Sequence, residues 1–249
     1  MSGPRQGWVP LVVQGREKWT ELLESFTWSG WETPFKSGQY VTIAAELDGE
    51  WVERHYSIAS RSGDPLELFL TLVPEGRLTP HLYKMNTGDQ LWCWPKPKGK
   101  FVLDKVPDGR DLWLVGTGTG LAPFLSMIRE GGCFERFEHV VLVHSVRHAA
   151  DLCYQPELRA LMARHPGLRY VPATSRESVE HALAGRVTTA LVSGELERWA
   201  ELELSGEHSQ VMLCGNPAML NEMKGLLDER GMPMHRRFSP GNVHMEKYW

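Results

Sequence analysis

The hydrophobic pattern of the chain changes near residue 105, and this change limits the possible folds more than any other feature. Before it, short segments alternate apolar and polar residues between turn formers, as antiparallel strands with one buried face do. After Asp111, short apolar runs alternate with stretches that suit helices, which indicates a parallel sheet covered on both faces. We therefore expect two domains: an antiparallel β-barrel over residues 1–104, and an α/β domain with a parallel sheet over residues 105–249.

The first half contains a clear hairpin signal. Asp48-Gly49 stands between the apolar segments 40–43 and 51–58, and both residues tolerate the positive φ of a tight turn. Segments 66–73 and 90–94 follow as further strands, at a spacing that favours a small barrel, with a β-sandwich as the alternative. The turn-forming residues 106–110 are the candidate linker.

Four apolar runs in the second half are expected to be strands of the parallel sheet. They are residues 112–115, 140–144, 169–173 and 210–214. In such sheets ligands bind outside the carboxyl ends of the strands, so we expect functional residues directly after these runs.

Composition excludes several classes of protein. With 42% hydrophobic and 23% charged residues, the 249-residue chain is neither disordered nor membrane-embedded. A net charge of −4 argues against nucleic-acid binding, which needs a surplus of Lys and Arg. The cysteines stand singly, so we expect no metal centre; they are Cys93, Cys133, Cys153 and Cys214. Without a signal-like start or an apolar run of about 20 residues, we expect a cytoplasmic protein that does not bind membranes.

The motif Gly116-Thr117-Gly118-Thr119-Gly120 connects an apolar strand to a helix that opens with Ala122-Pro123. Glycines allow the backbone to approach a ligand, and the unpaired amides of a helix start favour a negative or electron-rich group. The spacing is not the GxGxxG fingerprint, and a tight turn alone would also explain the glycines.

A second motif, Arg54-His55-Tyr56-Ser57, ends the second strand of the hairpin. An arginine can bind phosphate, a tyrosine ring can pack on a flat heterocycle, and a serine can hydrogen-bond a ring nitrogen. An exposed strand without a ligand explains the motif equally well.

A third motif, Gly76-Arg77-Leu78-Thr79-Pro80, predicts a short helix that is capped by Thr79 and begins at Pro80. Together with Arg54, Arg77 would then form a pyrophosphate cradle within the barrel domain. A capped loop with no ligand is the alternative.

Basic residues occupy the ends of the expected parallel strands, where many NAD enzymes have an acidic residue that binds the ribose. Arg147 follows the second strand, Ser175-Arg176 follows the third, and Arg186 comes ten residues later. Three guanidiniums could converge on a 2′-phosphate, which favours NADP over NAD, although each arginine alone could be a solvated loop residue.

Taken together, these motifs and Cys214-Gly215-Asn216-Pro217 occur in the order found in the ferredoxin/flavodoxin-NADP reductase family, which the chain resembles over essentially its whole length. The resemblance is greatest to the bacterial subclass, which also ends in a short aromatic tail like residues 246–249. It implies an FAD-binding barrel domain followed by an NADP(H)-binding α/β domain. The implied activity is hydride exchange between NADP(H) and FAD, coupled to one-electron transfer with a ferredoxin or flavodoxin carrier.

The resemblance also implies roles for individual residues. Tyr56 would lie against the isoalloxazine with Ser57 near its N5, Thr119 would approach from the second domain, and the tail would return to the flavin. Ser57 and Cys214 are the expected catalytic positions, Cys214 as a residue that lines the nicotinamide site and not as a nucleophile. The residues expected to bind cofactors are Arg54, His55, Tyr56, Ser57, Arg77, Leu78, Thr79, Thr119, Arg147, Ser175, Arg176, Arg186, Asn216, Tyr248 and Trp249. Whether the aromatic tail stacks on adenine or on isoalloxazine stays open.

Two alternatives remain at the level of the sequence. One is an enzyme of the same fold with another acceptor, such as a flavin reductase or the reductase component of an oxygenase. The other is a non-catalytic FAD-binding subunit that senses redox state. We expect the protein to be a monomer.

Overall fold

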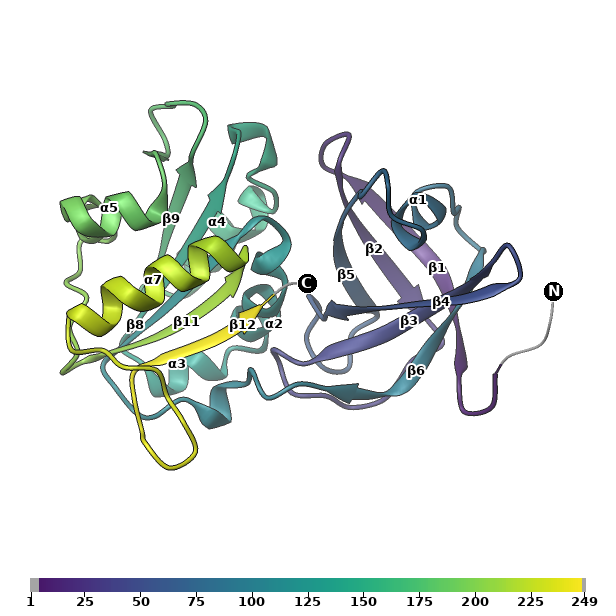
Figure 1. The fold of residues 1–249 in the computed structure, drawn as a ribbon, viewed down its shortest axis with the longest axis horizontal. Helices are drawn as coiled ribbons and strands as arrows, with labels where there is room; N and C mark the ends of the chain where they lie inside the picture. The colour runs from purple at the N-terminus through teal and green to yellow at the C-terminus, as the bar shows by residue number, and fades with distance from the viewer. Residues whose placement is uncertain (1–4, 248–249) are drawn as a thin grey trace.

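The computed structural model describes residues 5–247, which form two domains side by side, each built on a six-stranded sheet (Figure 1). The strands of the first sheet are β1 (Val9–Lys18), β2 (Leu23–Ser29), β3 (Tyr40–Leu47), β4 (Glu50–Ser57), β5 (Leu66–Thr71) and β6 (Gln90–Lys98), and helix α1 (Leu78–Leu82) lies between β5 and β6. The strand order is β4-β3-β6-β1-β2-β5, and every pairing is antiparallel. A bridge between Ile58 and Leu68 joins the two outer edges, so the sheet closes into the expected barrel.

The β3–β4 hairpin forms where the sequence predicts it. Asp48 and Gly49 have φ angles of 52° and 76°, the left-handed conformation that both central residues of a type I′ turn adopt. Inside the barrel, large side chains such as Phe26, Trp28 and Ile43 are fully buried, which gives this domain its own core.

The second sheet is parallel throughout, with the strand order β10-β9-β8-β7-β11-β12. Its strands are β7 (Asp111–Thr117), β8 (His139–Val146), β9 (Leu168–Thr174), β10 (Leu183–Ala184), β11 (Ser209–Gly215) and β12 (Val243–Lys247). Its helices are α2 (Ala122–Glu130), α3 (Gly132–Arg136), α4 (Gln155–Arg164), α5 (Val187–Ser193), α6 (Glu195–Ala200) and α7 (Pro217–Glu229), and the 3-10 turns are η1 (Leu103–Lys105), η2 (Gly118–Leu121) and η3 (Ala149–Asp151).

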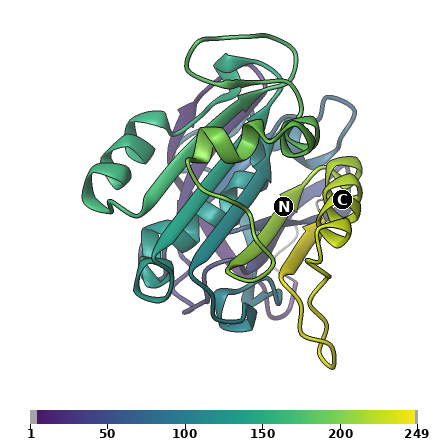
Figure 2. The same cartoon turned by 90° about the vertical axis from the view of Figure 1, so that its left-hand side faces the viewer.

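Helices cover both faces of this sheet, as Figure 2 shows from the side of the α/β domain. Along β7, Leu114 packs with residues of α2, α3 and α4, whereas its neighbours Trp113 and Val115 pack with α5, α6 and α7. The α/β expectation is therefore confirmed, because buried strands alternate their side chains between two apolar layers.

The two domains share part of their cores. Leu23 and Phe69 of the barrel belong to the same buried cluster as Phe124 and Leu125 of α2. The face of the parallel sheet that α2 covers is thus also the face on which the barrel packs.

Strand β12 is absent from the sequence-based expectations, which treat the end of the chain as a tail. It pairs with β11 in parallel register, from Val211 with Val243 to Gly215 with Lys247. The segment is short and partly polar because it forms the edge of the sheet. Among residues 5–247, no helix is long and apolar enough to cross a bilayer.

Candidate active site

A cleft of about 910 Å³ lies between the two domains in the described part of the chain. The barrel contributes the end of β4, the end of β5 and the start of α1, and the α/β domain contributes η2 and the end of β12. The lining residues are Tyr40, Arg54, His55, Tyr56, Ser57, Phe69, Leu70, Thr71, Val73, Gly76, Arg77, Leu78, Thr79, Thr119, Glu246 and Lys247. The cleft brings together residues of three sequence motifs that lie far apart along the chain.

The four residues of the second motif all line the cleft at the end of β4. Burial raises the pKa of Tyr56 to about 12 although the charge of Arg54 acts against this, so the phenol stays neutral at physiological pH. Ser57 is only 5% exposed. His55 Nδ1 lies 2.9 Å from the hydroxyl oxygen of Thr42, which fixes the imidazole.

The third motif lines the cleft, but the predicted cap was wrong. Helix α1 begins at Leu78 after a helical Arg77, and Thr79 caps nothing: its hydroxyl accepts from the Val73 amide at 3.0 Å and donates to the Val73 carbonyl at 3.3 Å. The threonine therefore ties the helix to Val73, two residues past the end of β5, because a residue already inside the first turn cannot act as the N-cap.

Arg77 is held by the β3–β4 hairpin. Its guanidinium pairs with Glu50 and donates to the Leu47 carbonyl at 3.1 Å. The hydrogen bond from Arg77 lowers the pKa of Glu50 below its usual value. This places a cation at the barrel side of the cleft.

The glycine motif forms the tight turn from β7 through η2 into α2, and Thr119 of this turn reaches the cleft. Gly118 has a φ of +54°, and a Cβ on Gly120 would lie 2.6 Å from the Cys214 carbonyl oxygen. Gly118 therefore serves the backbone conformation of the turn and Gly120 its close packing on β11, both independent of any ligand.

His144, to which the sequence assigns no role, supports the same turn. The side chain is fully buried at the end of β8, and its Nε2 lies 3.2 Å from the Gly118 carbonyl oxygen. Burial lowers the pKa of His144 to about 4, so the ring is neutral and donates its Nε2 proton to that carbonyl.

At the carboxyl end of β11, Cys214 is fully buried and is not among the residues that line the cleft. It lies in register with Gly116 of β7 and Glu246 of β12. Asn216 is the N-cap of α7, with its side-chain oxygen accepting from the Ala218 amide at 2.8 Å and the Met219 amide at 3.4 Å. The structural role of Asn216 is therefore visible without a ligand.

Glu246 and Lys247 line the cleft, and the sequence reasoning missed both as site residues. Burial raises the pKa of Glu246 to about 7, and its buried Oε2 has no hydrogen-bond partner among residues 5–247. A buried, unsatisfied carboxyl group in a cleft wall is typical of a site that a ligand completes. The available signal was an acidic residue within the short tail, two positions before Tyr248. Tyr248 and Trp249 lie outside the described residues.

The loops expected to bind a 2′-phosphate lie together at the carboxyl edge of the sheet. The Ser175 amide donates to Val146 at 2.9 Å, and the Arg176 amide donates to Arg147 at 3.0 Å. Arg186 follows β10, which pairs with the end of β9. All three guanidiniums are exposed, lie outside the 910 Å³ cleft, and form no ion pair within residues 5–247.

Comparison with known proteins agrees with this architecture. The family model described as an oxidoreductase NAD-binding domain matches residues 114–225. A ferredoxin NADP+ reductase from Neisseria gonorrhoeae, solved with bound FAD and NADP, superposes with a TM-score of 0.93 at 30% identity, over 98% of this chain and 100% of that one.

The fold and the cleft define a two-domain oxidoreductase in which a barrel faces a nucleotide-binding α/β domain. A flavodoxin/ferredoxin–NADP reductase from Escherichia coli is 41% identical over 97% of this chain and 99% of its own, and a ferredoxin–NADP reductase from Pseudomonas aeruginosa is 36% identical over 92% and 93%. The chain belongs to the flavodoxin/ferredoxin–NADP reductase family. The family, fold class and enzyme class expected from the sequence are thereby confirmed.

Proposed function

We propose that this protein binds FAD in the interdomain cleft and exchanges a hydride between NADP(H) and the flavin, coupled to one-electron transfer with ferredoxin or flavodoxin. The observation that carries the proposal is the cleft itself, which gathers Arg54–Ser57, the Arg77 loop and Thr119 around one space. The N. gonorrhoeae relative holds FAD and NADP, and the names of the E. coli and P. aeruginosa relatives specify the carriers.

The cleft residues fit FAD chemically. Arg54 and Arg77 supply guanidiniums for the pyrophosphate, with Leu78 and Thr79 beside them. Tyr56 offers a neutral aromatic ring that can pack against the isoalloxazine, and His55 also lines the cleft. The unsatisfied Glu246 oxygen adds a hydrogen-bonding position that the described residues leave open.

Bound FAD supplies the redox chemistry, because a flavin takes up two electrons with a hydride and releases them singly. The protein binds and orients the two ring systems. Ser57 would offer a hydroxyl to the flavin from the barrel, and Thr119 would approach it from the other domain. Cys214 stays a positioning residue for the nicotinamide, behind the turn that Gly120 forms against it.

Selectivity for NADP(H) rests on the exposed cationic loops. Arg147, Arg176 and Arg186, together with Ser175, would bind the 2′-phosphate that NAD(H) lacks. Asn216 would keep the adjacent loop in place, since it caps α7.

We also propose a domain boundary between residues 104 and 105, with the FAD-binding domain before it and the NADP(H)-binding domain after it. This boundary falls within η1.

The assignment of Ser57 is tested by Ser57→Ala. We expect hydride transfer from NADPH, followed by stopped-flow bleaching of the flavin, to slow more than FAD content falls. Ser209→Ala is the matched control, because Ser209 is also buried but is the first residue of β11, at the end of that strand away from the glycine turn. Equal losses of rate and of FAD in Ser57→Ala would contradict the assignment.

The acceptor is tested separately. NADPH oxidation should be faster with ferredoxin or flavodoxin than with free flavin, which distinguishes the proposed activity from that of a flavin reductase. Flavin that NADPH does not bleach would instead indicate a non-catalytic subunit.

The quaternary state and location are also proposals. We propose a cytoplasmic monomer that does not bind nucleic acid, in keeping with a net charge of −4 and four buried cysteines that form no disulfide with one another. Sedimentation of the FAD-loaded protein at the mass of one 28.3 kDa chain would support the monomer.

A further inference from the structure

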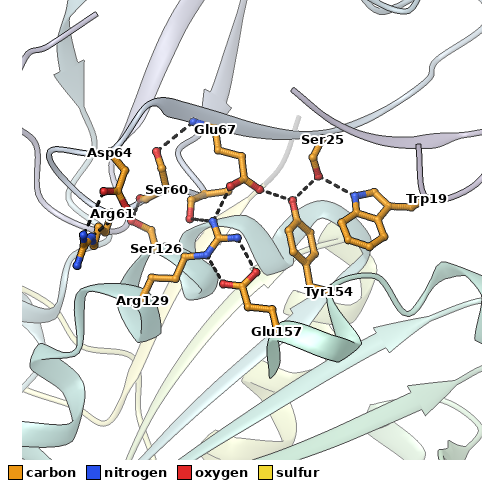
Figure 3. A network of polar contacts seen from close by, with 11 residues as sticks. Trp19, Ser25, Ser60, Arg61, Asp64, Glu67, Ser126, Arg129, Tyr154 and Glu157 are labelled. Carbon is orange, nitrogen blue, oxygen red and sulfur yellow. Dashed lines mark hydrogen bonds and ion pairs between the residues drawn. The ribbon is translucent and has the colours of Figure 1, made fainter. Parts of the chain in front are cut away.

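One guanidinium joins the two domains outside the set of residues that line the cleft (Figure 3). Arg129, near the end of α2, donates through Nη1 to the Ala59 carbonyl at 2.7 Å and to Glu67 Oε2 at 2.8 Å, both in the barrel domain. Its Nε and Nη2 donate to the two carboxylate oxygens of Glu157 on α4, at 2.6 Å and 2.8 Å. Arg129 thus contacts the barrel while α4 fixes its orientation.

Tyr154 forms a second connection to the same barrel carboxylate. Its hydroxyl donates to Glu67 Oε1 at 2.7 Å and is hydrogen-bonded to Ser25 of β2, which also accepts from the Trp19 indole at 2.7 Å. Both oxygens of Glu67 are therefore held by the α/β domain. We call Glu67, Arg129, Tyr154 and Glu157 the interdomain clamp.

The clamp is largely shielded from solvent, and its charges are fixed. The side chains of Arg129 and Glu67 are only 16% and 15% exposed. Burial works against the charged guanidinium, but the hydrogen bond to Glu157 and the charges of Glu67 and Glu157 raise the pKa of Arg129 above its ordinary value. For Tyr154, burial acts in the other direction: burial and the charge of Glu67 both raise its pKa, so the phenol keeps its proton. Loss of one partner would leave a partly buried charge unpaired, which costs more than the loss of a fully exposed ion pair.

The clamp shares its two main elements with the cleft. Phe69 lies two residues after Glu67 on β5. It lines the cleft and packs edge-on against the Tyr154 ring at a centroid distance of 5.2 Å. On the other side, the part of α2 from the turn that carries Thr119 to Arg129 is about 12 Å long. A rotation at the clamp therefore displaces Thr119 relative to the barrel wall.

We propose that Arg129 is a positioning residue for hydride transfer, which holds α2 against β5 so that the nicotinamide reaches the flavin at reacting distance. Hydride transfer needs the reacting atoms about 3–3.5 Å apart, and a misplacement of about 1 Å can cost about 100-fold in rate. The proposal rests on the proposed function, because it presumes that the two rings meet across the cleft.

The kinetic test compares Arg129→Met with Arg230→Met. Arg230 is a matched control because it also pairs with a glutamate, Glu197, and donates to the Leu191 carbonyl, but it lies entirely within the α/β domain. We expect Arg129→Met to slow flavin bleaching by NADPH roughly 10- to 100-fold, with changes below about threefold in KM for NADPH and in FAD content. Arg230→Met should retain the wild-type rate.

A distance measurement tests the geometry independently of activity. The native cysteines are all buried, so spin labels can be placed on Thr87→Cys in the barrel and Glu222→Cys on α7, both exposed positions. The label-to-label distance distribution should be narrow in the wild-type background and with Arg230→Met, and broader with Arg129→Met. An unchanged distribution, or an unchanged rate of flavin bleaching, would overturn the proposal.

Tyr154→Phe provides a milder variant if Arg129→Met does not fold. It removes one hydroxyl donor to Glu67 and keeps the ring against Phe69. The bleaching rate should fall and the distance distribution should broaden, each less than with Arg129→Met, and wild-type values for either would overturn the proposal. Failure of the proposed function is distinguishable, because then the wild-type protein itself would bind no FAD or would not be bleached by NADPH.

Discussion

At the scale of single residues, Glu246 couples the cleft to pH. Burial raises the pKa of Glu246 from 4.5 to about 7, so the native state keeps a proton that the unfolded chain loses. The stabilisation is fully present below pH 4.5, decreases as the pH rises between 4.5 and 7, and is lost above about 7. This shift corresponds to a loss of stability of about 3 kcal/mol at most.

Glu246→Gln should therefore flatten the pH dependence of stability. The amide has no proton to lose, so the free energy of unfolding should fall less between pH 5 and pH 8 than in the wild-type protein, by about 1 to 3 kcal/mol. Urea unfolding of the FAD-loaded protein at four pH values measures this difference. Glu222→Gln, on an exposed face of α7, is the control. The same slope in Glu246→Gln and wild type would show that the carboxyl group ionises normally.

Arg176 governs the choice of nucleotide in our proposal. Arg176→Ala should raise KM for NADPH about tenfold or more, since a charge-assisted hydrogen bond contributes about 1.5–3 kcal/mol, and should leave KM for NADH almost unchanged. Steady-state kinetics with both nucleotides give the ratio. Arg164→Ala, at the exposed end of α4, should change neither value. If the ratio of KM for NADPH to KM for NADH were the same in Arg176→Ala and in the wild-type protein, Arg176 would not be part of the phosphate site.

At the scale of elements, the turn between β7 and α2 depends on the absence of a side chain at one position. A Cβ on Gly120 would meet the Cys214 carbonyl at 2.6 Å, and the neighbouring atoms are backbone, which cannot move aside cheaply. Gly120→Ala should therefore lower the free energy of unfolding by about 1–3 kcal/mol and slow hydride transfer through displacement of Thr119.

The control for this prediction is Gly132→Ala at the start of α3, where a Cβ would meet nothing within 4 Å. Denaturant unfolding and stopped-flow bleaching of both variants give the comparison. Wild-type stability in Gly120→Ala would mean that the turn tolerates a shift away from β11.

The elements also show which structural features a sequence can predict. Asp48-Gly49 and the apolar runs of β7, β8, β9 and β11 carry local signals, so the hairpin and the parallel sheet were predictable. Strand β12 was not predictable, because a short and partly polar edge strand forms only through its pairing with β11. The prediction for Thr79 was wrong because its hydroxyl binds the Val73 backbone, just after β5, instead of its own helix.

The same distinction applies to the site. The motifs around Arg54, Arg77 and Thr119 were recognisable because their spacing is local, and all three reach the cleft. The clamp was not recognisable, since Glu67 and Arg129 are 62 residues apart and their contact exists only after the domains dock. Contacts between domains leave no periodic trace in either segment.

At the scale of the whole molecule, the two domains depend on each other for their packing. Leu23 and Phe69 of the barrel are buried in one cluster with Phe124 and Leu125 of α2, and Glu67 is paired across the boundary. A barrel that separated from its partner would expose those apolar side chains and leave the Glu67 charge without Arg129. Either loss is unfavourable, so partial unfolding of one domain should destabilise the other.

We therefore expect one cooperative unfolding transition for the FAD-loaded protein. Release of the flavin, seen as a rise in its fluorescence, reports on the barrel, whereas far-UV circular dichroism is dominated by the helices of the α/β domain. The two signals should give the same denaturant midpoint, because unfolding of either domain alone would expose the cluster that Leu23 and Phe69 share with α2. Two separated midpoints would mean that the shared cluster and the clamp contribute too little to couple the domains, and that each core is sufficient for its own domain.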